Sequence, residues 1–263
     1  MHIQVLGSGS GGNCALIRAG EVRLLVDAGL TRIDLEKRLI QAGLPPPTTT
    51  RPGLDHVLVT HGHLDHARSA GAIARKYRAR LHCAQALMSN ASIFRCKNLA
   101  TIAINRAVPL DAEQSVRFTA VELPHDAQPT VAYKVEHGER AAVILTDMGR
   151  PDDFVARLLH GAHVLVLEFN HDREMLDNGP YPPPLKKRVA GDRGHLSNDQ
   201  AAEMLKRLAS ENLHTLVLAH LSEKNNTPEL ALEVAQRTLK ELGLAHVRVL
   251  VASQHEIGEN LAV

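Results

Sequence analysis

The sequence predicts an α+β protein in which two β-sheets pack face to face, with helices on their outer sides. Apolar runs with the length of strands occur in two sets, one starting at residue 3 and one starting at residue 116. Capping signals mark helices between and after these sets. Because no internal repeat or low-complexity linker separates the two sets, we expect a single domain over residues 1–263.

Three strand-like runs open the chain, at residues 3–6, 15–18 and 22–26, with glycine-rich turns between them. We expect these strands to be antiparallel. A helix is predicted over residues 31–41, because Thr31 is a typical N-cap residue with Asp34 three positions later, and Gly43 follows its end. The run Pro45-Pro46-Pro47 then predicts a rigid surface loop.

The middle of the chain alternates between strands and helices. A short buried strand is predicted at residues 56–60, an amphipathic helix near residues 67–77, a strand at residues 80–83 and a helical stretch from Ala84. The second set of strands is predicted at residues 116–123, 131–135 and 141–146, followed by a helix at residues 152–159 and a strand at residues 163–169. Together these elements supply the strands of the two predicted sheets.

The last third of the chain begins with a proline-rich segment. Residues 178–194 contain four prolines and are predicted to be irregular. Ser197 caps a predicted helix that continues to about Leu208, and residues 213–219 form a strand. Thr227 followed by Pro228 opens a further helix, and residues 247–251 are predicted to close the chain as a strand.

The composition is that of a globular protein. Hydrophobic residues make up 44% of the chain and charged residues 22%. Aromatic residues make up only 3%, so stacking of bases on aromatic side chains cannot be the dominant mode of any nucleic-acid binding. The formal net charge of +1 gives no global signal for a polyanionic partner.

The cysteines and the N-terminus predict a cytoplasmic protein. Cys14, Cys83 and Cys96 are odd in number and lack a CxxC spacing, which favours reduced thiols. The first six residues read as a strand and do not resemble a signal peptide. Since no apolar segment approaches the length of a membrane span, we expect no membrane partner.

Metal-ligand side chains are concentrated directly after residues 56–60. The hexapeptide there contains His61, His63, Asp65 and His66. Imidazoles two residues apart can bind one divalent ion, and the carboxylate and imidazole that follow can face a second ion. The alternative is a polar loop rich in histidine, since the chain has 16 histidines. Four ligands crowded at a strand end nevertheless favour a binuclear hydrolase.

Three further polar residues directly follow apolar runs: His125, Asp147 and His220. Taken singly, each can be a turn, cap or surface residue. If their strands end at one edge of the sheets, however, they would gather beside the hexapeptide. Asp27 follows a strand in the same way and could orient a ligand through a hydrogen bond.

In order along the chain, these residues resemble the motifs of the metallo-β-lactamase superfamily of hydrolases. The resemblance implies an αββα sandwich of two mixed sheets with outer helices. It implies that His61, His63 and His125 hold one metal ion, and that Asp65, His66 and His220 hold another. Asp147 would bridge both ions, with Asp27 behind the ligands. The implied cofactors are two divalent ions, and the nitrogen and oxygen ligands suit Zn²⁺, Mn²⁺ or Fe²⁺.

Five longer segments narrow the resemblance. They read LGSGSGGNC from Leu6, VDAGL from Val26, EFNHD from Glu168, GHLSN from Gly194 and HLSEKNN from His220. They resemble the YycJ/WalJ group of bacterial metal-dependent exonucleases, which act on DNA from the 5′ end. This resemblance implies a nucleic-acid partner, namely DNA. It also implies substrate contacts at Ser8, Asn13, His171, Ser197 and Asn225.

His195 is a candidate catalytic residue, as is Asp65. His195 resembles the histidine that phosphodiesterases of the superfamily place near the leaving group. It also lies just before a helix start that would attract phosphate. The alternative is a solvated loop histidine. The preceding basic residues are equally consistent with phosphate contacts and with a solvated face. They are Lys186, Lys187, Arg188 and Arg193.

The function that these features predict is hydrolysis of a phosphodiester by a DNA exonuclease. Two cations would lower the pKa of a bridging water and give a hydroxide nucleophile, while His195 stabilises or protonates the leaving alkoxide. One alternative is a hydrolase of a cyclic phosphodiester or a thioester, although a thiolate leaves without an acid. A non-catalytic metal-binding module is the other alternative, and the complete ligand set disfavours it.

Overall fold

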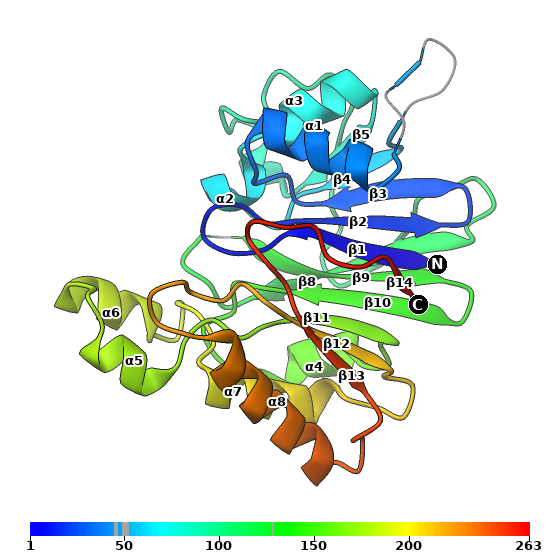
Figure 1. Ribbon diagram of the computed structural model, residues 1–263. Helices are drawn as coiled ribbons and strands as arrows, with labels where there is room; N and C mark the ends of the chain where they lie inside the picture. Colours follow the sequence, from blue (N-terminus) through cyan, green and yellow to red (C-terminus); the bar gives the residue numbers. More distant parts are fainter. Residues whose placement is uncertain (45–46, 49–52, 128) are drawn as a thin grey trace. The chain divides into compact units, whose positions relative to one another are not determined.

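The computed structural model of the chain describes residues 1–44, 47–48, 53–127 and 129–263 (Figure 1). Its contacts divide the chain into two compact units. Unit 1 comprises Met1–Ala120, Val135–Arg140 and Ser253–Val263, and unit 2 comprises Val121–Lys134 and Ala141–Ala252. The single domain predicted for residues 1–263 stays a prediction. The predicted Pro45-Pro46-Pro47 loop lies partly outside the described residues.

Unit 1 contains a seven-stranded mixed sheet with the order β14-β1-β2-β3-β4-β5-β6 (Figure 1). Its strands are β1 (His2–Gly7), β2 (Cys14–Ala19), β3 (Val22–Val26), β4 (His56–Leu58), β5 (Arg80–Cys83), β6 (Leu99–Thr101) and β14 (Leu261–Ala262). The antiparallel pairing predicted for the first three strands is confirmed. Strands β3 to β6 are parallel, so β4 and β5 end at the same edge of the sheet.

The helices of unit 1 are α1 (Arg32–Gln41), α2 (Leu64–Ala67) and α3 (Ala70–Tyr77), with a 3-10 turn at Gln85–Leu87. The predicted N-cap of α1 is confirmed, because the Thr31 side chain accepts a hydrogen bond from the Asp34 amide. Only the 3-10 turn forms where a longer helical stretch was predicted from Ala84, so that prediction was wrong in its extent.

The helix predicted near residues 67–77 is interrupted, and a diverted hydrogen bond explains why. In a continuous helix, the Ser69 amide would donate to the Asp65 carbonyl. Here the Asp65 carbonyl accepts from the Asn13 amide at 2.7 Å, and the Ser69 amide donates to the Ala28 carbonyl at 2.8 Å. The chain therefore ends α2 at Ala67 and starts α3 at Ala70.

The second seven-stranded sheet has the order β13-β12-β11-β10-β9-β8-β7. Its strands are β7 (Ala107–Pro109), β8 (Val116–Leu123), β9 (Thr130–His137), β10 (Arg140–Leu145), β11 (Val164–Glu168), β12 (Thr215–Ala219) and β13 (Arg248–Val251). Strands β10 to β13 are parallel neighbours, and β7 pairs antiparallel with β8. The predicted two mixed sheets with helices are thus present. The short strands β6, β7 and β14 were missed by the sequence analysis.

Unit 2 carries five helices: α4 (Asp153–Leu159), α5 (Arg173–Asn178), α6 (Pro183–Val189), α7 (Asn198–Leu208) and α8 (Pro228–Glu241). The predicted caps Ser197 and Thr227 are confirmed, and Ser197 forms a full capping box with Gln200. The irregular segment predicted at residues 178–194 was wrong, because it contains α6. Proline is tolerated in the first turn of a helix, where its missing amide has no partner to lose, and Pro183 starts α6 in this way.

Each unit has its own apolar core between sheet and helices. In unit 1, α1 packs on β1 and α3 packs on β4 and β5; in unit 2, α7 packs on β11, α4 and α8. Cys14, Cys83 and Cys96 are free and buried. Within the described part of the chain, no helix combines the length and the apolar character that crossing a bilayer requires.

Two histidines form a hydrogen-bonded pair within unit 1. His56 Nε2 lies 2.9 Å from the Leu110 carbonyl oxygen, so this nitrogen carries the hydrogen. A neutral His56 then offers Nδ1 as the acceptor for the N–H of His82 Nε2 at 3.0 Å. Burial lowers the pKa of His82 to about 3, with a further lowering by the charges of His56 and Arg80. Burial also lowers the pKa of His56.

We expect this pair to make the fold sensitive to acid. The unfolded chain protonates His82 as the pH falls below about 6.5, whereas the folded chain resists protonation down to about pH 3. The stabilisation is therefore complete above pH 6.5 and decreases by about 1.4 kcal/mol per pH unit below it, for one proton. Urea unfolding at pH 7 and pH 5 measures this slope. It should be shallower in His82→Gln and unchanged in the exposed control His246→Gln; an unchanged slope in H82Q would contradict the assignment.

Candidate active site

The predicted hexapeptide forms one cluster in unit 1. It leaves the end of β4 and enters α2, so its side chains lie at the carboxyl edge of the parallel strands. The ring centroid of His61 lies 4.7 Å from that of His63 and 4.2 Å from that of His66. Asp65 Oδ2 lies 3.4 Å from His66 Nε2. Unit 1 therefore brings together all four ligands predicted from this segment.

Asp27 and Thr60 lie behind these histidines. Asp27 Oδ2 accepts from His66 Nδ1 at 2.7 Å, and the Thr60 hydroxyl and amide both donate to the same carboxylate. His61 Nδ1 lies 3.1 Å from Thr60 Oγ1. With the hydrogen on Nδ1, the lone pair of each ring is on Nε2, the atom that would bind a metal ion. The sequence analysis predicted this role for Asp27 but missed Thr60.

Unit 2 contains a second cluster of predicted site residues. Asp147 and His220 follow β10 and β12, which lie on either side of β11 in a parallel arrangement, so both residues lie at the same sheet edge. The ring centroid of His195 lies 5.2 Å from that of His125 and 5.1 Å from that of His220. Asp147 Oδ1 lies within 3.8 Å of a ring nitrogen of each of these histidines. The predicted convergence of these strand-end residues within unit 2 is thus observed.

Glu168 joins this cluster and was not assigned a role from the sequence. Its Oε1 lies 2.9 Å from Nδ1 of both His195 and His220, and its Oε2 accepts from the Met148 and Leu196 amides at 3.1 Å. Burial by itself would raise the pKa of Glu168, but the charge of His195 and the hydrogen bonds from His195 and His220 outweigh it and lower the pKa to about 2. Glu168 is the last residue of the apolar strand β11, and the strand alone gives no sign of its two histidine partners.

The loop between α6 and α7 positions two histidines. His125 Nδ1 donates to the Gly194 carbonyl at 3.0 Å, and the His195 amide donates to the Val189 carbonyl at 2.9 Å. A Cβ at Gly194 would lie only 2.1 Å from the Val189 carbonyl oxygen, so only glycine fits this close approach. The loop that presents His195 therefore also fixes the ring of His125.

The backbone is strained at three predicted site residues. Asp27, Asp147 and His220 have φ angles of 64°, 63° and 56°, in the left-handed region that residues other than glycine seldom adopt. Asp27 and His220 directly follow a strand, and Asp147 lies two residues after the end of β10. Because strain of this kind is retained mainly where function requires it, these angles support a functional role for the strand ends.

Both clusters fit divalent cations. Thr60 and Asp27 accept from Nδ1 of His61 and His66 in unit 1, and the Gly194 carbonyl and Glu168 accept from Nδ1 of His125 and His220 in unit 2, which leaves Nε2 of these four rings as the ligand atom. Within unit 2, ligand-type atoms of Asp147, Glu168, His195 and His220 also lie within 4.8 Å of one another, and there Glu168 accepts from Nδ1 of both histidines. The imidazole nitrogens and carboxylate oxygens of the predicted ligands suit Zn²⁺, Mn²⁺ or Fe²⁺.

The five residues predicted to contact substrate are buried, and each forms hydrogen bonds within its own unit. Asn13 Nδ2 lies 3.4 Å from Asp65 Oδ2 and 3.0 Å from His66 Nε2, and the Ser8 hydroxyl donates to Asn13 Oδ1. In unit 2, the side chain of Ser197 caps α7, while the carbonyls of His171 and Asn225 accept from the amides of Asn198 and Asp172. Their contacts with substrate stay a prediction.

The basic residues before His195 lie on and after α6. Lys187, Arg188 and Arg193 are exposed, and Arg188 forms an ion pair with Asp126, next to His125. The Lys186 ammonium donates to the Asp177 carbonyl at 2.7 Å. Arg188 and Lys186 thus stabilise the position of α6, and phosphate contacts by these side chains stay a prediction.

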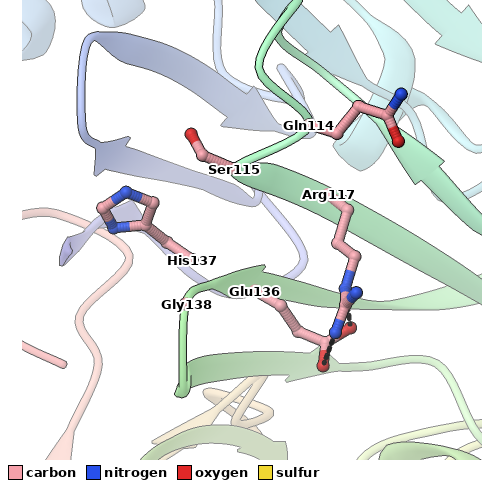
Figure 2. Close-up of a pocket in the computed structure, with 6 residues that line it drawn as sticks. All are labelled: Gln114, Ser115, Arg117, Glu136, His137 and Gly138. Atoms are coloured by element: carbon pink, nitrogen blue, oxygen red, sulfur yellow. Dashed lines mark hydrogen bonds and ion pairs between the residues drawn. The ribbon is translucent and has the colours of Figure 1, made fainter.

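A separate cavity of about 290 Å³ lies in unit 1 at the turns beside β8 and β9 (Figure 2). It is lined by Gln114, Ser115, Arg117, Glu136, His137 and Gly138. Arg117 and Glu136 form an ion pair at its rim, as Figure 2 shows. Because its lining contains none of the predicted site residues, the cavity is distinct from the unit 1 cluster.

Comparison with known proteins gives a consistent result. A family model described as a beta-lactamase superfamily domain matches residues 22–221 of the chain. The exodeoxyribonuclease YycJ of Bacillus anthracis is 33% identical over 245 residues, which cover 92% of this chain and 90% of that protein. The exodeoxyribonuclease WalJ of Streptococcus pneumoniae is 32% identical over 232 residues, which cover 86% and 84%.

A solved structure shares the fold. The metallo-beta-lactamase fold protein YhfI from Bacillus subtilis matches with a TM-score of 0.73 at 16% identity, over 97% of this chain and 98% of that chain. The predicted fold class and the predicted resemblance to the YycJ/WalJ group are thereby confirmed.

Proposed function

Because this chain belongs to the beta-lactamase superfamily, we propose that it is a metal-dependent exonuclease that degrades DNA from the 5′ end. Two relatives that are 33% and 32% identical over most of the chain are named exodeoxyribonucleases. The observation that carries the proposal is Glu168, which holds His195 beside the predicted metal ligand His220. This arrangement supplies a proton donor, which an alkoxide leaving group requires and a thiolate does not.

The proposed centre would contain two divalent cations. On the family pattern, one cation is assigned to His61, His63 and His125, and the other to Asp65, His66 and His220. Asp147 is assigned to both. Such cations neutralise phosphate oxygens and lower the pKa of a bound water toward neutrality. Asp27, Thr60 and Glu168 would hold the ligand rings in orientation, as their hydrogen bonds in each unit indicate.

His195 is the proposed proton donor to the leaving oxygen. Its Nδ1 hydrogen is held by Glu168, so its Nε2 is the nitrogen that can carry a second proton toward substrate. The hydrogen bond to the Glu168 carboxylate keeps the ring in the same orientation before and after the proton has left. Asp65 is proposed both as a metal ligand and as a catalytic residue.

Replacement of His195 by Ala should lower the rate of DNA cleavage by roughly 10²–10⁴-fold, the usual contribution of general acid catalysis. Metal content should stay unchanged, because His195 is not among the proposed ligands. Turnover on labelled DNA and metal analysis by mass spectrometry measure the two effects. His246→Ala, at an exposed position, is the control. If H195A cleaved DNA at the wild-type rate, the proton-donor role would be wrong.

The proposed function is tested by digestion of end-labelled substrates in the presence of Mn²⁺. We expect release of nucleotides from the 5′ end of linear DNA, with DNA preferred over RNA, and complete loss of activity on chelation. A cyclic phosphodiester and a glutathione thioester serve as competing substrates. Hydrolysis of the thioester alone would reject the nuclease assignment, and release from the 3′ end would reject the proposed polarity.

A further inference from the structure

An exposed aromatic side chain lies near the metal-ligand segment of unit 1. The chain contains four phenylalanines and no tryptophan. Phe118 and Phe169 are fully buried, whereas Phe94 is 53% exposed. Leu64, inside the hexapeptide, is 64% exposed. Phe94 and Leu64 are therefore large apolar side chains of unit 1 that are accessible to a ligand.

The position of Phe94 follows from the sheet and from specific contacts. Strands β4 and β5 are parallel, so the segment after β5 and the hexapeptide after β4 leave the same edge of the sheet. Asn90 Nδ2 lies 3.5 Å from the Gly62 carbonyl oxygen, and the Phe94 amide donates to the Asn90 carbonyl at 2.9 Å. Phe94 is therefore one turn away from a residue that contacts the loop between His61 and His63.

The charge around Phe94 indicates the kind of partner. The guanidinium carbon of Arg95 lies 5.2 Å from the centre of the Phe94 ring, and Lys97 is also exposed. An aromatic ring flanked by cations matches a nucleotide, in which a flat apolar base is joined to an anionic phosphate. An apolar protein surface would leave these cations without a counter-charge.

We propose that Phe94 is a stacking platform for one nucleobase of the bound DNA strand, with Arg95 at the adjacent phosphate. This inference rests on the proposed function, because it names how that same substrate is held. One platform agrees with the scarcity of aromatic residues, which excludes stacking as the dominant source of affinity. Every base can stack on an aromatic ring, so Phe94 would contribute to DNA affinity without selecting a particular base.

The test measures binding of single-stranded DNA that carries phosphorothioate linkages and 2-aminopurine near its 5′ end, in Mn²⁺. The wild-type chain should quench the 2-aminopurine fluorescence. Phe94→Ala should abolish this quenching and weaken binding roughly tenfold, whereas Phe94→Trp should retain both. Phe154→Ala is the matched control, because Phe154 is 49% exposed and lies 5.8 Å from the guanidinium carbon of Arg157. Thermal unfolding confirms that each variant is folded.

DNA with an abasic site at the probe position separates the loss of stacking from other causes of weaker binding. The wild-type chain should bind abasic DNA about as weakly as F94A binds intact DNA, and F94A should lose nothing further. Equal binding of intact DNA by F94A and wild type, or equal losses in F94A and F154A, would overturn the stacking role. If wild type cleaves natural DNA in a parallel assay, such a result leaves the proposed function standing. If wild type neither binds nor cleaves DNA, both inferences are wrong.

Discussion

Replacement of Glu168 by Gln is expected to lower DNA cleavage by about 10³–10⁴-fold, because one carboxylate accepts hydrogen bonds from two imidazoles. Oε1 accepts from both Nδ1 atoms and Oε2 accepts from the Met148 and Leu196 amides, so the NH2 group of a glutamine faces either both rings or both backbone amides. In the first orientation each ring must give up its Nδ1 hydrogen and carry it on Nε2, so His220 loses its ligand lone pair and His195 can no longer hold protons on both nitrogens. In the second orientation the buried Met148 and Leu196 amides lose their acceptor.

The metal content of the variant distinguishes Glu168 from His195. E168Q should lose part of its bound metal together with its activity, whereas H195A should lose activity alone. Steady-state rates on end-labelled DNA and metal analysis of the purified proteins provide the comparison. Glu136→Gln is the control, because Glu136 is paired with Arg117 at the cavity in unit 1. Wild-type turnover in E168Q would show that the shared carboxylate has no catalytic consequence.

Replacement of Gly29 by Ala should destabilise the fold by more than about 3 kcal/mol, well beyond an ordinary surface substitution. A Cβ at this position would lie 1.6 Å from the Asp65 carbonyl oxygen and 2.1 Å from its carbonyl carbon. These are backbone atoms of the ligand segment, so no side-chain rotation relieves the clash. The loop after β3 or the turn at Asp65 must move, and both carry predicted site residues.

Gly43 offers a matched control for this variant. Its φ angle is +73°, and no atom lies within 4 Å of the position of a Cβ. Gly43→Ala should therefore cost only about 1 kcal/mol, from the left-handed backbone alone. Urea unfolding compares the two variants with wild type, and DNA cleavage reports on the ligand segment. Equal stability of G29A and G43A would show that the approach to Asp65 is not restrictive.

Most of the candidate site could be predicted from the sequence because its residues follow strands. Parallel strands end at one edge of a sheet, so an apolar run followed by Asp or His predicts a shared location. This reasoning identified Asp147, His125 and His220 in unit 2, and it placed the hexapeptide after β4 in unit 1. The capped helices were also predictable, since their caps depend on residues adjacent in sequence.

The remaining features depend on contacts that a single strand or loop does not reveal. Glu168 reads as the polar end of a buried strand, and only the fold places it against two imidazoles. The prolines at the start of α6 favour a loop as strongly as a first helical turn, so that helix was missed. Strands β6, β7 and β14 have two or three residues each, which is too short for a periodic pattern.

The interruption between α2 and α3 gives the connection from β1 to β2 an unexpected constraint. The amide of Asn13 takes the carbonyl of Asp65 that a helix would otherwise use for itself. An ordinary hairpin loop accepts insertions and deletions, since little depends on its length. Here the insertion or deletion of one residue would displace the Asn13 amide and, through its hydrogen bond, the turn that carries Asp65 and His66. This glycine-rich connection thus works as a spacer of fixed length, although the family pattern assigns it no ligand.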